Sequence, residues 1–480
     1  MRRKVHVSWL IALFCLGILI GVFSAQYVVR SFGLSAWLLV PVFLLIVVML
    51  GRQRVYLVPF VIIVGVLLGL WRGTAAATEL SNVKKFHNQE VTVQGKVLED
   101  ADIGASGQLV LRLGDLIINE EQTPGHLWIT IVSGDVKRGE IITVHGVLAE
   151  GFGNFSGVMY RGQVDKITCP NPGDTARAIR DWFADSIRKV IPEPEASLGI
   201  GYLVGQRRAL PPDLNESLRI AGLTHVVVAS GYNLTILVRF TRRLFARVSK
   251  YLSAAIAGTM IVSFIAVTGM SPSMSRAGLV AGLSLAAWYY GRRFHPIALI
   301  LIVAAVTVII NPSYLWGDLG WQLSFAAFSG VMILAPLLQR YFFGDKKPGA
   351  IRQVLGETVS AQLVTAPLIA MSFGQFSNVA VIANILVLPL IPLAMLLTFV
   401  AGLVGLLLPQ LVAETISLPA TWLLKYMVKV ADYTANLSWA ITETNILWFG
   451  LIICYAIMAV ICIYLSHATS YRLREVNLVE

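Results

Sequence analysis

Charged residues are scarce in this sequence, and so are the patterns that would indicate a metal centre or a disulfide framework. Only 14% of the 480 residues are charged and 56% are hydrophobic, against about 25% charged in a typical soluble domain. Of the four cysteines, only Cys169 lies outside the apolar runs, and no partner is near it. The seven histidines show no ligand spacing. The composition therefore excludes an ordinary soluble domain, and we expect neither a metal nor another cofactor.

Long apolar runs are abundant instead. Many approach or reach the roughly 20 residues that an α-helix needs to cross about 30 Å of hydrocarbon. Three of them, 9–29, 35–50 and 55–71, fill an N-terminal membrane region at residues 1–72. A second membrane region is expected at 174–480, with spans at 225–238, 252–270, 275–291, 296–310, 319–338, 357–373, 378–408 (one piece or two) and 446–466.

Residues 80–168 between these regions change in character. Five short runs alternate apolar and polar residues, which is typical of strands. They are 90–99, 108–119, 126–132, 139–150 and 158–168. Five strands in so short a segment favour a small barrel such as an OB-fold. The fold class is therefore a polytopic α-helical membrane protein with an inserted small all-β, OB-like, extracytoplasmic domain.

The charge of the β domain leaves its role open. It holds 8 Lys/Arg and 11 Asp/Glu, a net charge of −3, so it does not attract phosphates as a whole. A local patch remains a candidate for nucleic-acid contact, whereas gating or assembly is the alternative role. The patch consists of Lys137, Arg138, Phe152, Phe155, Tyr160 and Arg161.

Basic clusters predict the orientation in the membrane. Arg2 to Lys4 precede the first run, and Arg52 and Arg54 separate the second run from the third. The positive-inside rule places such clusters in the cytoplasm. The N-terminus is then cytoplasmic, three crossings deliver the β domain outside the cytoplasmic membrane, and later loops at 239–250, 292–293 and 340–352 return to the cytoplasm.

Two further segments are amphipathic at helical spacing. In 175–190, Ile179, Trp182, Phe183, Ile187 and Val190 lie on one face. The segment 413–433 repeats the pattern, and its apolar face is expected to hold Ile416, Leu423, Tyr426, Met427 and Val430. Both are expected to lie along the membrane surface.

Several motifs follow one another across about 200 residues of the second membrane region. They are GLTHVVVASGYNL (222–234), TGMSPSMSRA (268–277), DLGWQLSF (318–325), QLVTAP (362–367), FGQFS (373–377) and NILVLP (384–389). In this order they resemble the ComEC family of competence membrane proteins. Asn233 stands where members commonly have a second histidine. The metal-binding H-x-H-x-D-H cluster of many members is absent from this sequence, so we do not carry over a metallo-β-lactamase-like domain or its nuclease activity, and we expect no enzyme.

The resemblance implies a channel that passes single-stranded DNA across the cytoplasmic membrane during natural transformation. The implied partners are the lipid bilayer, a separate cytoplasmic DNA-translocating motor and a DNA receptor, and a homo-oligomer is left open. This sequence contains no nucleotide-binding phosphate loop. The alternative function is a small-molecule or ion transporter, or a membrane enzyme that processes envelope intermediates.

Polar residues inside the apolar segments are the candidate lining of such a path, because a bilayer tolerates them only against a cavity or a partner. Hydrogen bonding between helices is the competing explanation for most of them. Arg276 and Asp318 differ, since both lie at outer span ends, and we expect them to be partners at the entry. The candidates are His225, Ser230, Gly231, Asn233, Ser273, Arg276, Asp318, Gln322, Ser324, Gln362 and Asn384.

The predicted topology is testable with a reporter inserted at Gly107, in the β domain. A reporter that is active only outside the cytoplasm should be active there, because three spans precede it. Cys169 should also react with a membrane-impermeant thiol reagent on intact protoplasts. Activity of a cytoplasm-specific reporter at the same position would refute the topology.

Overall fold

The structure is a computed structural model that describes residues 6–27, 57–103, 107–132, 134–170, 173–206, 210–227, 231–344, 349–444 and 446–471. The predicted span 35–50, the basic clusters at 2–4 and 52–54, and Ser230 lie outside these residues. The chain forms two compact units. The first comprises 1–174, 269–276 and 297–322, and the second comprises 175–268, 277–296 and 323–480.

The first unit begins with two closely packed helices, α1 (Val7–Ala25) and α3 (Val58–Val83). Each carries glycines four residues apart, and these face one another across the pair. A Cβ on Gly17 would lie 2.6 Å from the carbonyl oxygen of Ile62, and a Cβ on Gly69 would overlap that of Ile18. Small residues at this spacing let two apolar helices approach closely enough for backbone contact.

The β domain follows directly. Its strands are β1 (Gln89–Val97), β2 (Asp102–Ile103), β3 (Leu109–Ile118), β4 (Glu121–Thr123), β5 (Leu127–Ile131), β6 (Ile141–Glu150), β7 (Gly157–Met159) and β8 (Gln163–Thr168). All five predicted strand runs are present, and the last is divided between β7 and β8.

These strands close into a ring. The order is β1-β3-β5-β7-β6, and β1 pairs again with β6, from Gln89 opposite Leu148 to Lys96 opposite Ile141. All these pairings are antiparallel except that of β5 with β7. Side chains that point into the ring, such as Leu111 and Leu113 on β3 and Ile129 on β5, are fully buried. The alternation read from the sequence therefore corresponds to a barrel with an apolar interior.

The remainder of the first unit consists of residues 269–276, α11 (Pro296–Ile310), α12 (Ser313–Gly317) and the turn that follows with the start of α13 (Leu319–Ser329). Arg72 on α3 donates hydrogen bonds to the carbonyl oxygens of Ile309 and Ile310, at the end of α11. The indole nitrogen of Trp316 donates to the carbonyl oxygen of Val22 on α1, at 2.8 Å. These contacts satisfy backbone oxygens that helix ends leave free.

The second unit is helical, apart from one two-stranded ribbon among its described residues. Its elements are α4 (Thr175–Arg188), α5 (Glu195–Val204), α6 (Pro212–Ile220), α7 (Thr224–Val227), α8 (Gly231–Phe245), α9 (Lys250–Thr268), α10 (Pro272–Tyr289), α13 (Leu319–Ser329), η4 (Gly330–Leu334), α14 (Ala335–Phe343), α15 (Ala350–Phe373), β9 (Gln375–Ser377), α16 (Ala380–Val387), η5 (Leu388–Leu390), α17 (Ile391–Leu407), α18 (Gln410–Ala435), β10 (Ile441–Glu443) and α19 (Trp448–Ala468).

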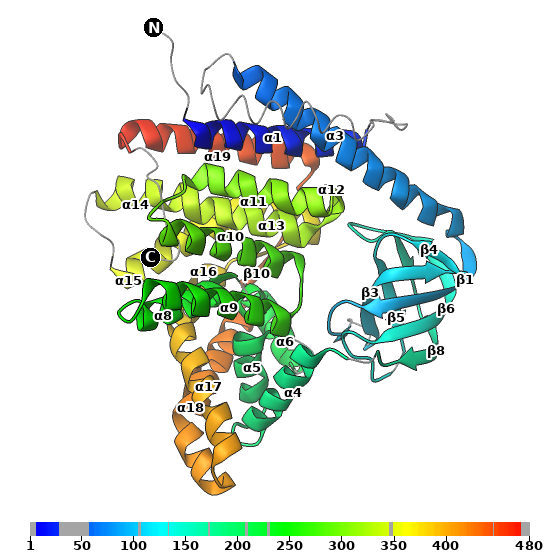
Figure 1. Ribbon diagram of the computed structural model, residues 1–480. Coiled ribbons are helices and arrows are strands. Elements are labelled where there is room, and N and C mark those ends of the chain that lie inside the picture. The colour runs from blue at the N-terminus through cyan, green and yellow to red at the C-terminus, as the bar shows by residue number, and fades with distance from the viewer. Residues whose placement is uncertain are drawn as a thin grey trace. The chain divides into compact units, whose positions relative to one another are not determined.

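Helix α5 is buried on every side, and α17 and α18 pack beside it and against each other (Figure 1). Helix α4 contacts α17 where Gly402 and Gly405 leave room for Phe183 and the backbone of Ser186. The hydroxyl of Ser186 donates to the carbonyl oxygen of Gly402 at 3.1 Å. This group forms the largest apolar core of the second unit.

The apolar faces of the two amphipathic helices are only partly covered by protein. On α4, Ile187 is buried, whereas Ile179 and Trp182 are about 60% exposed (61% and 59%). On α18, only Met427 of the expected apolar face is fully buried, and the packed face consists mainly of small residues. Ala413, Ser417, Ala420 and Ala431 belong to it. The larger apolar side chains are left exposed, as suits contact with lipid rather than protein.

Two predicted spans are interrupted. The run 319–338 contains a π-helical turn, η4, between α13 and α14. The run 378–408 consists of α16 and α17 joined through η5, with Pro389 in the joint and Pro392 at the start of α17. Pro389 and Pro392 explain the break in the run 378–408, because proline lacks the backbone N–H that a helix needs.

Seven helical stretches among the described residues are long and apolar enough to cross a membrane. They are Val7–Ala25, Val58–Phe86, Lys250–Thr268, Leu319–Phe343, Arg352–Phe373, Ala380–Leu407 and Trp448–Ala468. The predicted combination of membrane helices with a small β barrel is thus confirmed.

The glycine contact between α1 and α3 gives a stability prediction. Gly21→Val should lower the stability of the protein by about 1–3 kcal/mol, because its Cβ would overlap the Val66 carbonyl oxygen. The matched control is Ile20→Val, since Ile20 is 45% exposed. Thermal unfolding of both variants in detergent measures the difference. Equal unfolding temperatures would contradict backbone contact at this position.

Candidate functional site

The clearest polar site of the first unit is the turn at Asp318, between α12 and α13. Asp318 is only 9% exposed. Its Oδ1 accepts a hydrogen bond from the backbone nitrogen of Trp321 at 2.6 Å, which caps the start of α13. Its Oδ2 accepts one from the side-chain amide of Asn154 at 2.8 Å. The carboxylate therefore links the turn to the β6–β7 loop of the barrel.

A glycine pair makes this link possible. Gly153 and Gly317 precede Asn154 and Asp318 and lie against each other. A Cβ on Gly153 would lie 3.0 Å from the Gly317 oxygen, and a Cβ on Gly317 would overlap the Gly153 backbone. With side chains at either glycine, the amide and the carboxylate would be held apart.

Charges around the turn act on the carboxylate in opposite directions. Burial raises the pKa of Asp318 above its usual range and Glu99 adds to this rise, whereas the Trp321 N–H, Arg276 and Arg112 lower the pKa without cancelling it. Arg276 is 5% exposed, and its guanidinium donates to the Ser273 hydroxyl and carbonyl oxygens at 3.2 and 3.3 Å. The structure thus brings three predicted site residues, Ser273, Arg276 and Asp318, into one electrostatic group.

An aromatic cluster continues from the same loop across the barrel. Phe152 and Phe155 pack on Trp128 with ring centroids 5.4 and 5.3 Å away. The guanidinium of Arg112 lies 5.5 Å from the Trp128 ring and forms ion pairs with Glu99 and, at 2.8 Å, with Asp102. Burial lowers the pKa of Arg112, but the two carboxylates outweigh burial and raise it. Arg112 therefore stays cationic beneath the aromatic rings.

The predicted barrel patch is only partly assembled. Phe152 and Phe155 come together as described, and Tyr160 and Arg161 are exposed at the β7–β8 turn. Arg138 is 5% exposed and forms an ion pair with Asp174 at 2.7 Å. Lys137 faces Asp135 at 3.5 Å. The charge of Arg138 is thus neutralised within the protein, whereas Lys137 and Arg161 face solvent.

Two of the polar candidates in the second unit, Asn233 and Asn384, are buried. Asn233 is fully buried and donates a hydrogen bond to the Tyr202 carbonyl oxygen at 3.0 Å, which matches the helix-to-helix role. Asn384 is 2% exposed, and its Oδ1 has no partner among the described residues. Gly231 begins α8 and lies close to Ala277, and His225 is exposed on α7.

The remaining candidates are partly buried. Ser324 lies on α13 and Gln362 on α15. In the first unit, the side-chain amide of Gln322 donates to the Leu315 carbonyl oxygen at 3.4 Å. The backbone nitrogen of Gln322 also donates to the carbonyl oxygen of Asp318 at 3.0 Å, so Gln322 adjoins the group at that turn.

Sequence reasoning missed several residues. Asn154 and Trp128 belong to no motif in the sequence. Gly151 and Gly153, on either side of Phe152, did indicate a tight turn at this place. Tyr202 and Thr398 have buried hydroxyls without a partner among the described residues, and each stands alone in an apolar run. Unpaired buried hydroxyls are unusual and mark places that suit water or a polar ligand.

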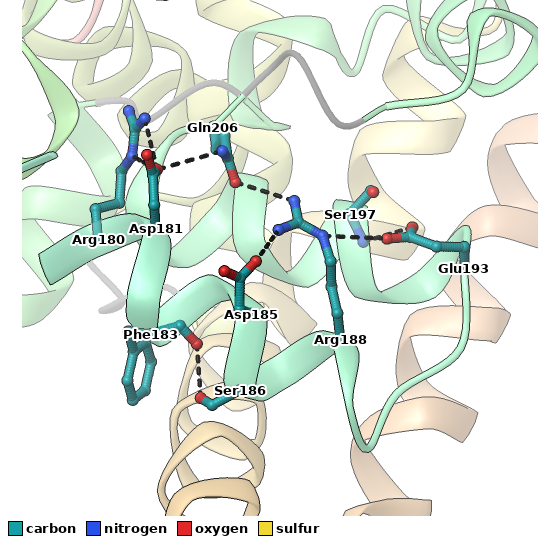
Figure 2. A network of polar contacts seen from close by, with 9 residues as sticks. All are labelled: Arg180, Asp181, Phe183, Asp185, Ser186, Arg188, Glu193, Ser197 and Gln206. Atoms are coloured by element: carbon teal, nitrogen blue, oxygen red, sulfur yellow. Dashed lines mark hydrogen bonds and ion pairs between the residues drawn. The ribbon is translucent and has the colours of Figure 1, made fainter. Parts of the chain in front are cut away.

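A polar network ties α4 to the start and end of α5 (Figure 2). Arg188 lies at its centre and contacts Asp185 at 3.1 Å, Glu193 at 3.5 Å and the side-chain oxygen of Gln206 at 3.1 Å. Glu193 in turn accepts from the backbone nitrogen of Ser197 at 3.1 Å, in the first turn of α5. The network fixes the position of α4 from both ends of α5, and it explains the polar face seen in the sequence.

A family model described as competence protein matches residues 202–468, which is more than half of the chain. The chain belongs to the ComEC family of competence proteins. Among curated proteins, it is 23% identical over 261 residues to ComE operon protein 3 of Bacillus subtilis (strain 168). That match covers 53% of this chain and 33% of the relative, so the chain spans about a third of that protein. No solved structure matches.

Family membership agrees with the apolar helices, and together they indicate a multi-pass membrane protein. The matched region contains all of the motifs quoted from the second membrane region. Arg276 and Asp318 therefore belong to the family region, whereas Asn154, Trp128 and the barrel precede it.

The raised pKa of Asp318 predicts a pH dependence. Because the pKa of Asp318 is higher in the folded state, the folded protein holds this proton at pH values where the unfolded chain has lost it. The free energy of unfolding therefore falls as pH rises from the ordinary carboxyl pKa through the folded-state pKa. Asp318→Asn retains an oxygen for the Trp321 N–H but has no charge. Its unfolding temperature relative to the native protein should therefore rise between acidic and neutral pH.

The unfolding temperature of Asn154→Ala, measured over the same pH range, serves as the comparison. Removal of the amide leaves Oδ2 of Asp318 buried without that partner, and it should cost about 1–3 kcal/mol at neutral pH. If the difference in unfolding temperature between Asp318→Asn and the native protein does not change with pH, the pKa of Asp318 is not raised in the folded state.

Proposed function

We propose that this protein passes single-stranded DNA across the cytoplasmic membrane during natural transformation. Arg276 is the observation that carries the proposal. It is a buried cation near the start of α10, within the family stretch TGMSPSMSRA, and its charge lowers the pKa of the Asp318 carboxyl. A buried guanidinium held by serine oxygens is suited to a phosphate, since it presents several donors in a fixed plane.

Buried polar groups within the apolar helices support a path through the second unit. The hydroxyls of Tyr202 and Thr398 and the amide oxygen of Asn384 lie on α5, α17 and α16, without partners among the described residues. A wet path requires polar groups of this kind at membrane depth. In this proposal they contact water or the passing strand.

We assign the barrel to the OB class and place it outside the cytoplasmic membrane. In support, the first strand pairs with the fourth long strand, β6, and β5 runs parallel to β7, which is the Greek-key closure of that class. The cluster of Trp128, Phe152 and Phe155 offers ring faces of the sort that stack on unpaired bases. In this arrangement the barrel receives the strand before it reaches Asp318.

The proposal gives the chain a passive role. Energy for transport comes from a separate cytoplasmic motor, and the DNA is delivered by a separate receptor. The chain itself performs no cleavage in this proposal. Charge steering at the entry is then its main contribution, which makes the entry the place to test.

Arg276→Ala should reduce DNA internalisation roughly tenfold to a hundredfold, the range expected for the loss of one charge-assisted contact. The variant replaces the native gene in a transformable strain, and uptake of labelled DNA is measured. Arg276→Lys should restore uptake only in part, because an ammonium cannot bind a phosphate in the bidentate way. Lys425→Ala, which removes an exposed cation on α18, is the matched control.

Two outcomes would contradict the proposal. If Arg276→Ala lowers the amount of folded protein and the double variant with Asp318→Ala restores it, the two residues form a structural ion pair. If deletion of the gene leaves transformation unchanged, the protein is not a DNA channel, and a solute transporter becomes the better explanation.

A further inference from the structure

An open apolar groove lies between α9 and α10 in the second unit. Its volume is about 390 Å³, and Ala254, Gly258, Ile261, Val262, Gly282, Leu285, Ala286, Tyr289 and Tyr290 line it. Two glycines create the hollow. A Cβ on Gly282 would meet nothing within 4 Å, and one on Gly258 would meet only the tip of Leu285 at 4.0 Å. The two helices therefore touch elsewhere and leave this stretch unfilled.

The helices are held together beyond the groove, at Gly278. A Cβ on Gly278 would overlap the side chain of Ile265 on α9. The groove therefore lies beside a point at which the two helices are in close contact. Helix α9 is one of the stretches long and apolar enough to cross a membrane, and Val262 in the groove is 68% exposed.

One end of the groove is aromatic and cationic. Tyr289 and Tyr290 line it there, and Tyr251 at the start of α9 packs on Tyr289 with ring centroids 5.6 Å apart. The ammonium of Lys250 lies 5.4 Å from the Tyr289 ring and 5.9 Å from the Trp288 ring. Lys250 is exposed, so its charge is displayed at the mouth of the groove.

Further cations surround the same end. Arg243 and Arg247 precede Lys250 in the connection from α8 and are exposed, and Arg292 follows Tyr290 directly after Gly291 and is exposed too. The guanidinium of Arg242 lies 5.1 Å from the Trp288 ring. An apolar groove that ends in such a cluster combines the two chemistries of a phospholipid, an acyl chain and an anionic phosphate.

We propose that this groove binds one anionic phospholipid, with an acyl chain between α9 and α10 and the phosphate at Lys250. The groove alone gives little preference, since surrounding lipid tails are as apolar as the groove. The cationic end supplies the selectivity, because basic pockets between membrane helices attract anionic headgroups. This site is separate from the proposed DNA path and does not depend on it.

Lipid retention tests the site directly. Native mass spectrometry of the full chain, released from nanodiscs of equal phosphatidylglycerol and phosphatidylcholine, counts the lipids that stay bound. We expect the native protein to retain one phosphatidylglycerol in preference to phosphatidylcholine. Gly282→Leu fills the groove and should reduce retention of both lipids at least fivefold. Lys250→Gln leaves the groove open and should abolish the preference for the anionic lipid while phosphatidylcholine is still retained.

Matched variants separate these effects from misfolding. Gly349→Leu adds the same bulk at another glycine with nothing within 4 Å, and Lys425→Gln removes an exposed cation on α18. Both should retain lipid as the native protein does. Gly258→Leu fills the groove from the other helix, and it repeats the test if Gly282→Leu fails to fold.

Two results would overturn the proposal. One is equal retention of the two lipids by the native protein, or unchanged retention by both groove-filling variants. The other is a native protein that is dimeric and becomes monomeric on Gly282→Leu with no change in bound lipid. In that case the groove would receive a helix of a second copy of the chain.

Discussion

Close approach of backbones at glycine determines how segments of this protein meet. In a bilayer, burial of apolar side chains drives helix association weakly, because lipid tails offer an equally apolar surface. Contact must then come from dense packing, which glycine permits by removing the side chain that would keep two backbones apart. Gly17 and Gly69 do this for α1 and α3, and Gly405 does so for α4 on α17. The same device operates between a helix end and a loop, where Gly317 of α12 meets Gly153 of the β6–β7 loop.

Close packing of this kind constrains the polar groups near it. Once backbones are in contact, a side chain such as Asn154 or Ser186 reaches its acceptor directly, with no room for water between them. Where packing is dense and no acceptor lies within reach, as at Tyr202 and Thr398, the hydroxyl is left without a partner among the described residues. Buried polar groups within the apolar helices of the second unit are therefore isolated, in contrast to the connected network around Arg188.

Much of the architecture was predictable from periodicity and composition. Apolar length identified the helices, alternation identified all five strand runs, and the ordered motifs identified the family. Contacts between distant segments were not predictable, because no local pattern relates Asn154 to Asp318 or Phe152 to Trp128. The protein-facing side of α18 was not predictable either, because hydrophobicity marks the large side chains expected at the membrane surface, whereas protein packing there uses Ala413, Ser417 and Ala420.

The π-helical turn Gly330–Leu334 shows how a membrane helix can gain one residue during evolution. One residue added to an α-helix rotates everything beyond it by about 100°, which would turn lipid-facing side chains inward. A π-turn takes up the extra residue locally, and at Gly330 the widened turn lies directly on the backbone of Ser360. The chain can therefore carry a one-codon insertion in the middle of a membrane helix while both flanking halves keep their original faces.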